Sequence, residues 1–161
     1  MTITLREDPA VTELRRIVES ELPIATKFIY ANLFEANFGL DQLSQSEEFP
    51  VFLFIANDKS TNRLTETGLI VRDVSVTGML LNSIPANETM DFKTEDVSPY
   101  IEQMRQLGDS LIYQINKSSM TYPTSPILNY TFDKVYAKFD AHLFGVGMTF
   151  TWSINTYSRG C

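Results

Sequence analysis

Few residues of this chain are of the types that perform chemistry. Among 161 residues there is one histidine, His142, and one cysteine, Cys161. A cysteine and a histidine can act together as nucleophile and base, but here the pair would require the last residue to be held in place. A single histidine cannot build a histidine-rich metal site. We therefore interpret His142 as a polar residue in a hairpin turn.

Glycine patterns add no nucleotide site. No glycine-rich segment ends in Gly-Lys-Ser or Gly-Lys-Thr, so the sequence contains no P-loop. Gly145 and Gly147 lack the third glycine of a dinucleotide-binding fingerprint and lie within a predicted strand. Their small size indicates instead that a neighbouring backbone approaches this strand closely.

Acidic side chains are the remaining candidates for catalysis. Adjacent carboxylates occur at residues 47–48 and 95–96, but such pairs in a charged loop are usually only solvated. Twenty acidic residues against thirteen basic ones give a formal net charge of −7. Phosphate binding favours the opposite balance, because the release of counterions drives protein–nucleic acid affinity. The sequence therefore predicts no enzyme, no cofactor, no metal and no tight nucleic-acid binding.

The elements that must position any site belong to one domain over residues 1–161, with a short flexible N-terminus at about residues 1–8. Apolar residues make up 43% of the chain, enough for one hydrophobic core. The first ten residues carry charges where a signal peptide needs an apolar run, and no apolar stretch approaches the ~20 residues that cross a bilayer. A lone cysteine forms no internal disulfide, so we expect a reducing cytoplasm or a particle assembled there.

The N-terminal part predicts a helix followed by a strand. Asp8 as N-cap and Pro9 as first helical residue predict an amphipathic helix over residues 9–21. Residues 27–35 have apolar side chains at both odd and even positions and are rich in aromatic residues. This pattern indicates a strand buried on both faces, with a helix as the alternative. A polar connection over residues 37–49 follows.

The next part predicts a long hairpin. Residues 51–56 are continuously apolar, as in a central strand covered on both faces. Residues 57–62 are a polar tip, and a strand-forming run over residues 65–81 follows. Gly68 and Gly78 near the ends of this run suggest a bend or bulge.

A long helix and a second hairpin complete the chain. After a polar loop over residues 82–96, Ser98 and Pro99 predict the start of a helix over residues 99–116. Gly108 lies beside its apolar stripe, where it either admits a close strand or is simply tolerated. Residues 127–137 and 144–154 alternate with period two, which predicts a hairpin with one buried and one polar face. The predicted fold is α+β: an antiparallel β-sheet with long hairpins, packed on one face by two helices.

The order of these elements resembles a known family. An aromatic strand precedes Phe49-Pro50-Val51-Phe52-Leu53, and a hairpin and a long helix come next. The chain closes with Phe139-Asp140-Ala141-His142-Leu143-Phe144-Gly145 and a near-terminal Cys161. From about residue 10 to residue 161, this resembles the tail-terminator and tail-completion proteins of tailed bacteriophages.

The resemblance implies a structural subunit of the virion neck or tail. Such proteins are non-enzymatic and close into rings, here a hexamer or dodecamer, at the junction of head connector and tail. The implied partners are portal-side adaptor or connector proteins and tail tube or tail proteins, with DNA passing through the channel without specific binding. The implied location is the virion, assembled in the host cytoplasm. The family has no catalytic residues to transfer.

We hypothesise that the polar tip, the polar loop and the small-residue face of the last strand make the contacts between subunits or with partners. The candidate residues are Asn57, Asp58, Lys59, Ser60, Thr61, Asn62, Met90, Asp91, Phe92, Gly145, Gly147, Thr149 and Thr151. The alternative function is a non-catalytic ligand- or partner-binding α+β module, which would be monomeric with an apolar pocket between helix 99–116 and the sheet. An enzyme would instead bring acidic residues from separate segments together in a cleft.

Overall fold

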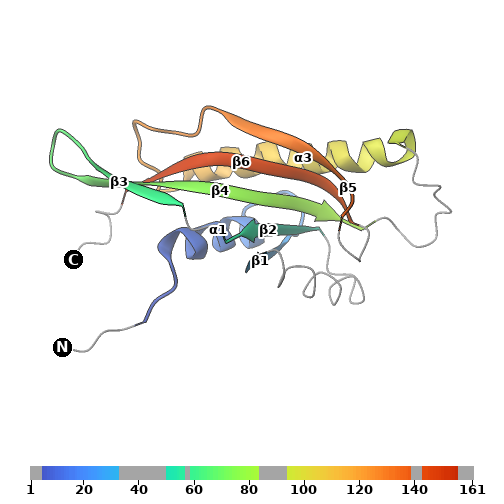
Figure 1. Cartoon of the computed structure of the whole chain (residues 1–161), viewed down its shortest axis with the longest axis horizontal. Coiled ribbons are helices and arrows are strands. Elements are labelled where there is room, and N and C mark those ends of the chain that lie inside the picture. The colour runs from blue at the N-terminus through green and yellow to red at the C-terminus, as the bar shows by residue number, and fades with distance from the viewer. Residues whose placement is uncertain (1–4, 33–49, 57–58, 84–93, 139–142, 156–161) are drawn as a thin grey trace.

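The computed structural model describes residues 5–32, 50–56, 59–83, 94–138 and 143–155 (Figure 1). Its helices are α1 (Pro9–Ser20) and α3 (Thr94–Lys117), and its strands are β1 (Lys27–Ala31), β2 (Val51–Ile55), β3 (Ser60–Leu64), β4 (Ile70–Asn82), β5 (Tyr130–Lys138) and β6 (Leu143–Asn155). The strands form one six-stranded sheet, and both helices pack on one of its faces. The predicted α+β class and the helices on one face are confirmed.

One strand pair departs from the predicted antiparallel sheet. The strand order is β1-β2-β4-β6-β5, with β3 also paired to β4, and β1 runs parallel to β2. A parallel pair requires a crossover connection rather than a tight turn. Residues 37–49, predicted to be a polar connection, lie outside the described residues. Periodicity reports which side chains are buried, and it carries no information on strand direction.

The predicted hairpin tip is partly wrong. Residues 60–62 belong to β3, which pairs with β4, and the turn lies further along, between Thr65 and Leu69. Gly68 supplies the positive φ of +83° that this turn requires. The tip was predicted too early because the polar side chains of β3 lie on an edge strand, where polar residues are as much at home as in a turn.

Strands β2 and β3 follow one another along the same side of β4. Phe54 pairs with Gly78, and Ser60 pairs with Val74, so the register shifts by two residues between the two strands. β4 itself is continuous through Gly78, where no bulge occurs. A Cβ there would lie 2.5 Å from the ring of Phe52, so Gly78 makes room for an aromatic side chain.

The helix α1 begins as predicted. Asp8 is its N-cap and accepts a hydrogen bond from the backbone N–H of Ala10 (2.9 Å), and a proline occupies the first helical position. Its apolar face is buried against the sheet, through Ala10, Val11, Leu14, Ile17 and Val18. The carboxylate of Asp8 also binds Arg72 of β4, so the cap ties the helix to the sheet.

The helix α3 starts at Thr94, five residues before the predicted first residue. Pro99 therefore lies inside the helix, as its sixth residue. A proline so near the N-terminus removes only one helical hydrogen bond close to the end where backbone N–H groups lack partners anyway. Gly108 does admit a close strand: a Cβ there would lie 2.6 Å from the ring of Phe132 on β5.

The main core lies between the helices and the sheet. The alternation predicted for β6 is confirmed, with Phe144, Val146, Met148, Phe150, Trp152 and Ile154 all buried on the helix side. The indole of Trp152 donates a hydrogen bond to the hydroxyl of Thr121 (2.8 Å), which in turn donates to the Ile115 carbonyl at the end of α3. Buried polar atoms are paired here, as burial requires.

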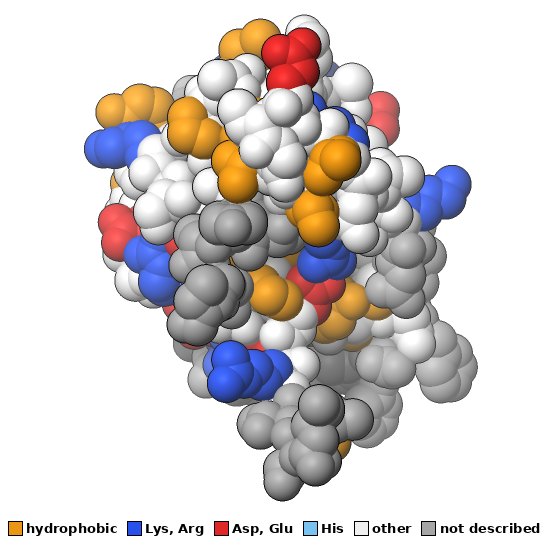
Figure 2. Space-filling model, turned by 90° about the vertical axis from the view of Figure 1, so that its left-hand side faces the viewer, with side chains coloured by type: hydrophobic (Ala, Val, Ile, Leu, Met, Phe, Trp, Pro, Cys, Tyr) orange, Lys and Arg blue, Asp and Glu red, His pale blue; other side chains and the backbone are white. Residues whose placement is uncertain are grey.

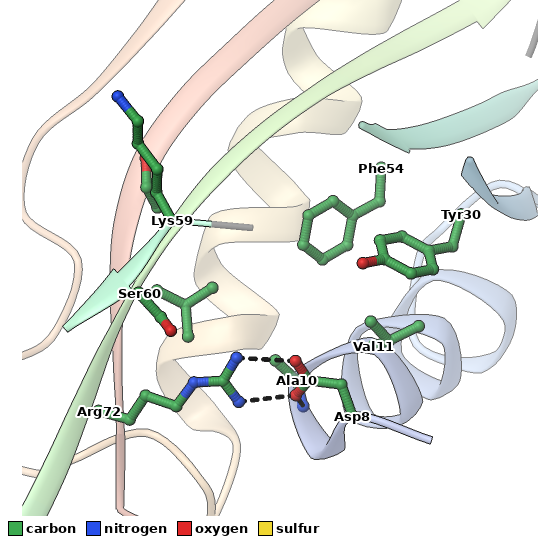
Figure 3. A pocket seen from close by; sticks show the side chains of 10 residues that line it. Asp8, Ala10, Val11, Tyr30, Phe54, Lys59, Ser60 and Arg72 are labelled. Atoms are coloured by element: carbon green, nitrogen blue, oxygen red, sulfur yellow. Dashed lines mark hydrogen bonds and ion pairs between the residues drawn. The ribbon is translucent and has the colours of Figure 1, made fainter. Parts of the chain in front are cut away.

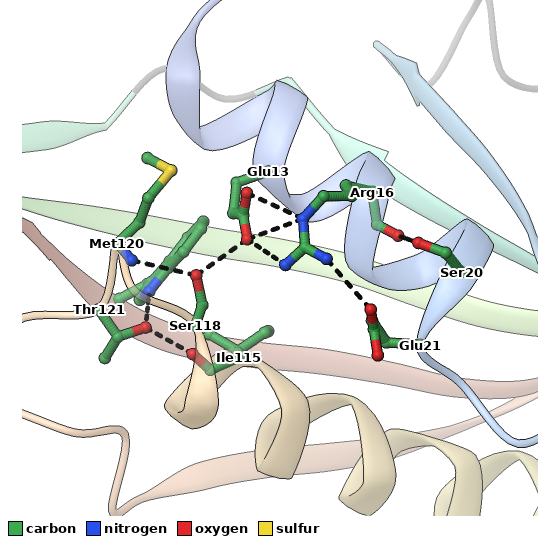
Figure 4. A network of polar contacts seen from close by, with 9 residues as sticks. Glu13, Arg16, Ser20, Glu21, Ile115, Ser118, Met120 and Thr121 are labelled. Atoms are coloured by element: carbon green, nitrogen blue, oxygen red, sulfur yellow. Dashed lines mark hydrogen bonds and ion pairs between the residues drawn. The ribbon is translucent and has the colours of Figure 1, made fainter. Parts of the chain in front are cut away.

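A polar network joins the two helices beside this core (Figure 4). The Ser118 hydroxyl donates to Glu13 of α1 (2.9 Å) and accepts from the backbone N–H of Met120 (3.2 Å). Glu13 also binds Arg16, whose guanidinium reaches Glu21. The end of α3 is thereby connected to α1 by side chains as well as by packing.

The opposite face of the sheet, called the outer face below, is polar over only part of its area. A second buried cluster lies there, formed by Ala31, Val51, Leu53, Leu81 and Leu143. The predicted division of the last hairpin into one buried and one polar face is therefore wrong near the start of β6. Gly145 is buried too, and the β4 backbone approaches it so closely that an added Cβ would overlap the Leu80 carbonyl oxygen.

Two glycines of β6 offer a matched test of this packing. At Gly147 the atom nearest to an added Cβ would be 3.8 Å away, whereas at Gly145 the added Cβ would overlap the backbone of β4. We expect Gly145→Ala to lower the free energy of unfolding by about 3 kcal/mol or more, because backbone must move to relieve the overlap. Gly147→Ala should change it by less than about 1 kcal/mol. Urea unfolding at pH 7 measures both, and equal effects would contradict the close approach.

Candidate contact surfaces

Hydroxyl side chains form rows across the outer face of the sheet. Thr77 of β4 pairs with Thr149 of β6, which pairs with Thr131 of β5. In the next row on this face, Ser75 pairs with Thr151. Thr131, Thr149 and Thr151 are exposed to solvent. This part of the outer face is therefore a regular, mainly uncharged surface built on the two longest strands.

One end of the outer face is held by a charged network. The carboxylate of Asp73 accepts hydrogen bonds from Arg63 of β3 (3.0 Å) and from the Ser153 hydroxyl of β6. The Arg63 guanidinium also donates to Ser125 (3.1 Å) and lies 5.8 Å from the ring centroid of Tyr122. These contacts tie the β3–β4 hairpin to the segment before β5, so the hairpin has a defined position.

The predicted contact residues fall into three groups. Asn57, Asp58, Met90, Asp91 and Phe92 lie outside the described residues. Gly145 is buried where β6 lies against the backbone of β4, so it takes part in packing within the chain. The structure places the remaining seven residues on β6, on β3 or directly before it: Lys59, Ser60, Thr61, Asn62, Gly147, Thr149 and Thr151.

Residues predicted from separate segments meet at one depression. Lys59, Ser60 and Thr61 line a hollow of about 220 Å³ together with Thr151 of β6. Asp73 and Ser75 of β4 complete its lining. The sequence suggested the two segments separately, and it is their common pairing with β4 that brings them together.

A cavity of about 190 Å³ lies on the helix side, where β2 ends and β3 begins (Figure 3). Ala10, Val11, Phe54 and Val74 form its apolar wall, and Tyr30 packs edge-on against Phe54 with ring centroids 5.1 Å apart. The rest of the lining is polar and comes from Asp8, Lys59, Ser60, Arg72 and Ser75. Sequence patterns did not indicate this cavity, because it results from the register shift between β2 and β3.

An ion pair closes one side of this cavity. Both terminal nitrogens of Arg72 bind the Asp8 carboxylate, each at 2.7 Å (Figure 3). The hydrogen bonds from Arg72 hold the pKa of Asp8 below its ordinary value, and the N–H of Ala10 lowers this pKa further. The same carboxylate raises the pKa of Arg72. Asp8 thus stays ionised at neutral pH and acts as both helix cap and anchor.

The described residues hold no cluster of three metal-ligating side chains. Glu7, Asp8 and Glu102 each have a lowered pKa, and in each case a hydrogen bond from an arginine is the main cause. Tyr130 has a raised pKa because its hydroxyl donates to Asp109 (2.8 Å). His142, Cys161 and the carboxylates at 47–48 lie outside the described residues.

The end of the molecule that carries the β3–β4 turn differs from the charged surfaces around α1 and α3. This hairpin projects past the other described elements (Figure 1), and viewed from that end the surface shows hydrophobic side chains together with polar groups and several charged side chains (Figure 2). Leu64 and Ile70, which face each other across the hairpin, are 72% and 48% exposed. These two exposed apolar side chains make the projecting hairpin a candidate contact surface.

Comparison with known proteins leaves this geometry as the main guide to function. No protein-family model matches the sequence, and none of the curated proteins matches it either. None of the helices in the described part of the chain is both long and apolar enough to cross a membrane.

The Asp8 anchor predicts a pH-dependent contribution to stability. Asp8→Asn keeps a capping side chain but removes the ionic contact with Arg72, and we expect it to lower the free energy of unfolding by about 1 kcal/mol at pH 7. Because the folded-state pKa is lowered, this contribution is present above the ordinary value of 3.8 and is lost as the pH falls through the folded-state pKa. Urea unfolding of both proteins from pH 7 to pH 2.5 measures the difference. Glu19→Gln, an equivalent change at an exposed position of the same helix, is the control, and a pH-independent difference at Asp8 would contradict the anchor.

Proposed function

We propose that this chain is a structural subunit of a virion neck or tail-terminator ring that joins the head connector to the tail and forms part of the DNA channel. The proposal builds on the resemblance in element order to tail-terminator and tail-completion proteins. The observation that supports it most is the outer face of the sheet, a broad surface of exposed hydroxyl groups with no reactive cluster among the described residues.

The dimensions of this face suit contact with a large partner. β4 and β6 each have 13 residues and pair along almost their whole length, a span of about 43 Å at ~3.3 Å per residue. Such a span exceeds what a small ligand needs and matches the scale of a subunit interface or of a channel wall. The threonine rows lie near its middle, flanked by the charged network of Arg63 and Asp73.

The charge of the chain agrees with a channel through which DNA moves. Hydroxyl groups can hydrogen-bond to phosphates and water without the strong attraction of clustered lysines and arginines. A net charge of −7 for each subunit, repeated around a ring, repels the DNA backbone and opposes tight binding. In this proposal the portal-side adaptor and the tail tube bind the two ends of the ring, and the projecting β3–β4 hairpin lies at one of these ends.

The proposal predicts self-association or incorporation into particles. Native mass spectrometry of the purified chain should detect a closed ring, a hexamer or dodecamer, and negative-stain imaging of the same sample should show rings. If rings form only on a template, the chain should be present at fixed stoichiometry in purified virions. A chain that is monomeric at high concentration and absent from purified particles would contradict the proposal and favour a monomeric binding module.

A substitution on the outer face should separate assembly from folding. Thr149→Arg places a charge at the centre of the threonine row. Because the Thr149 side chain is exposed, its replacement removes no contact in the core. We expect its free energy of unfolding to stay within about 0.5 kcal/mol of the wild type, while ring formation or incorporation into particles falls at least about tenfold. Ser119→Arg, an equal charge change at an exposed site outside this face, is the matched control. Normal assembly of Thr149→Arg would remove the outer face from the proposed interface.

A further inference from the structure

The strand β3 is an edge strand without the usual protection. All five of its residues are exposed, and among the described residues it pairs only with β4. Natural edge strands are normally blunted by proline, by a bulge or by a free charge that discourages pairing with another chain. β3 contains no proline, and its single charge, Arg63, is already paired with Asp73. Within the part of the chain that the structure describes, this edge is therefore open to a further strand.

The backbone groups available on this edge follow from the hydrogen bonds on the other side. Ser75 donates to the Lys59 carbonyl (3.0 Å), and Thr65 donates to the Leu69 carbonyl (2.8 Å). Hydrogen-bonded positions alternate along an antiparallel strand, so the backbone N–H and C=O groups of Thr61 and Arg63 also point toward β4. The N–H and C=O groups of Ser60, Asn62 and Leu64 consequently point away from the sheet, three donors and three acceptors in a row.

This edge carries an exposed apolar side chain, and a cavity with one apolar wall lies beside it. Leu64 is 72% exposed. It pairs with Ile70, which lies two positions along β4 from Arg72 and therefore on the same, helix side of the sheet. Directly paired residues share a face, so Leu64 also lies on the helix side. The 190 Å³ cavity lies on the same side, at the Ser60 end of β3. A cavity of about 150 Å³ already holds a benzene-sized apolar group, so this one has room for a leucine side chain.

We infer that β3 pairs antiparallel with β3 of a second copy of this chain, about a twofold axis through Asn62. In this register Asn62 faces Asn62 of the other copy and Ser60 faces its Leu64, so the outward groups form six backbone hydrogen bonds. Leu64 of each copy then reaches the cavity beside Ser60 of the other copy. A twofold interface must be complementary to itself, and this strand meets that condition at both ends.

The charges on the edge agree with this pairing. Arg63 faces Thr61 of the other copy, and Lys59 faces its Thr65, so within residues 59–65 no like charges lie directly opposite each other. Each Arg63 also keeps its contact with Asp73, which lies on β4 of its own chain.

This twofold contact does not depend on the proposed ring. A dimer of this kind can form in a binding module as well as in a virion protein. If the chain also closes into rings through other surfaces, a twofold contact at β3 joins two free rings face to face through their hairpin ends. This contact would then compete with the partner that binds the hairpin end in the proposed neck or tail.

Sedimentation velocity of the full chain tests the contact through two independent variants. Asn62→Pro removes an outward N–H and leaves the ladder with β4 intact. Leu64→Asp replaces the side chain that would contact the apolar wall of the cavity with a charged one. We expect the wild type to dimerise with rising concentration, and each variant to dimerise at least about tenfold more weakly, because a twofold interface carries every change twice. Leu128→Asp alters an equally exposed leucine (78%) outside this edge and should dimerise normally. Circular dichroism shows whether each variant is folded.

A distance measurement tests the register itself. With Cys161→Ser and a spin label on Glu66→Cys, the two labels of a dimer are eight residue positions apart along the paired strands, about 27 Å at ~3.4 Å per residue. Double electron–electron resonance should report this distance for dimers and, if rings form, for paired rings. A monomeric wild type at about 100 μM, an association unaffected by Asn62→Pro and Leu64→Asp, or a different label distance would overturn the inference. Rings without this label distance would contradict the β3 contact but not the proposed function. A dimer with this label distance, formed by a chain that is absent from virions, would support the β3 contact and contradict the proposed function.

Discussion

The packing of α3 against the paired strands β4 and β6 is the contact on which the rest of the structure depends. β6 places six large apolar side chains on the helix side, and α3 approaches closely because Gly108 has no side chain to meet Phe132. Trp152 is fully buried at this contact, and its only polar side-chain atom is satisfied by Thr121. Burial of these apolar side chains contributes to the hydrophobic stabilisation of the chain.

The surfaces open to partners follow from what this core leaves uncovered. Because both helices lie on one face, the threonine rows of β4, β5 and β6 remain exposed on the other. Because β2 and β3 share one side of β4 with a shift in register, a cavity forms between them and β3 becomes an open edge. The same continuous strand, β4, thus creates the broad outer face and the narrow edge, which suit two different kinds of contact.

Charge divides these surfaces further. The arginines of α1, α3 and β3 are engaged by carboxylates, as is Arg72 of β4 by Asp8; on α3, Arg105 binds Glu102 and Asp109. Paired charges of this kind contribute little to stability when exposed, but each carboxylate partly neutralises the guanidinium that it binds. In the proposed neck or tail ring, this pairing would weaken the attraction between the subunit and DNA.

The sequence by itself determined the elements whose signals are local. The cap at Asp8, the helical spacing of α1 and the strict alternation of β6 each depend on residues within a few positions of one another, so the α+β class and most element positions were predicted correctly. Only the tertiary structure decided the parallel pairing of β1, the place of residues 60–62 in β3, the burial of Gly145 and the ion pair between Asp8 and Arg72. These features join residues far apart in the chain, 64 positions in the case of that ion pair, and no periodicity encodes such partners. The open edge of β3 and the neighbouring cavity were likewise decided by the tertiary structure, because both result from the pairing of β2 and β3 with the same side of β4.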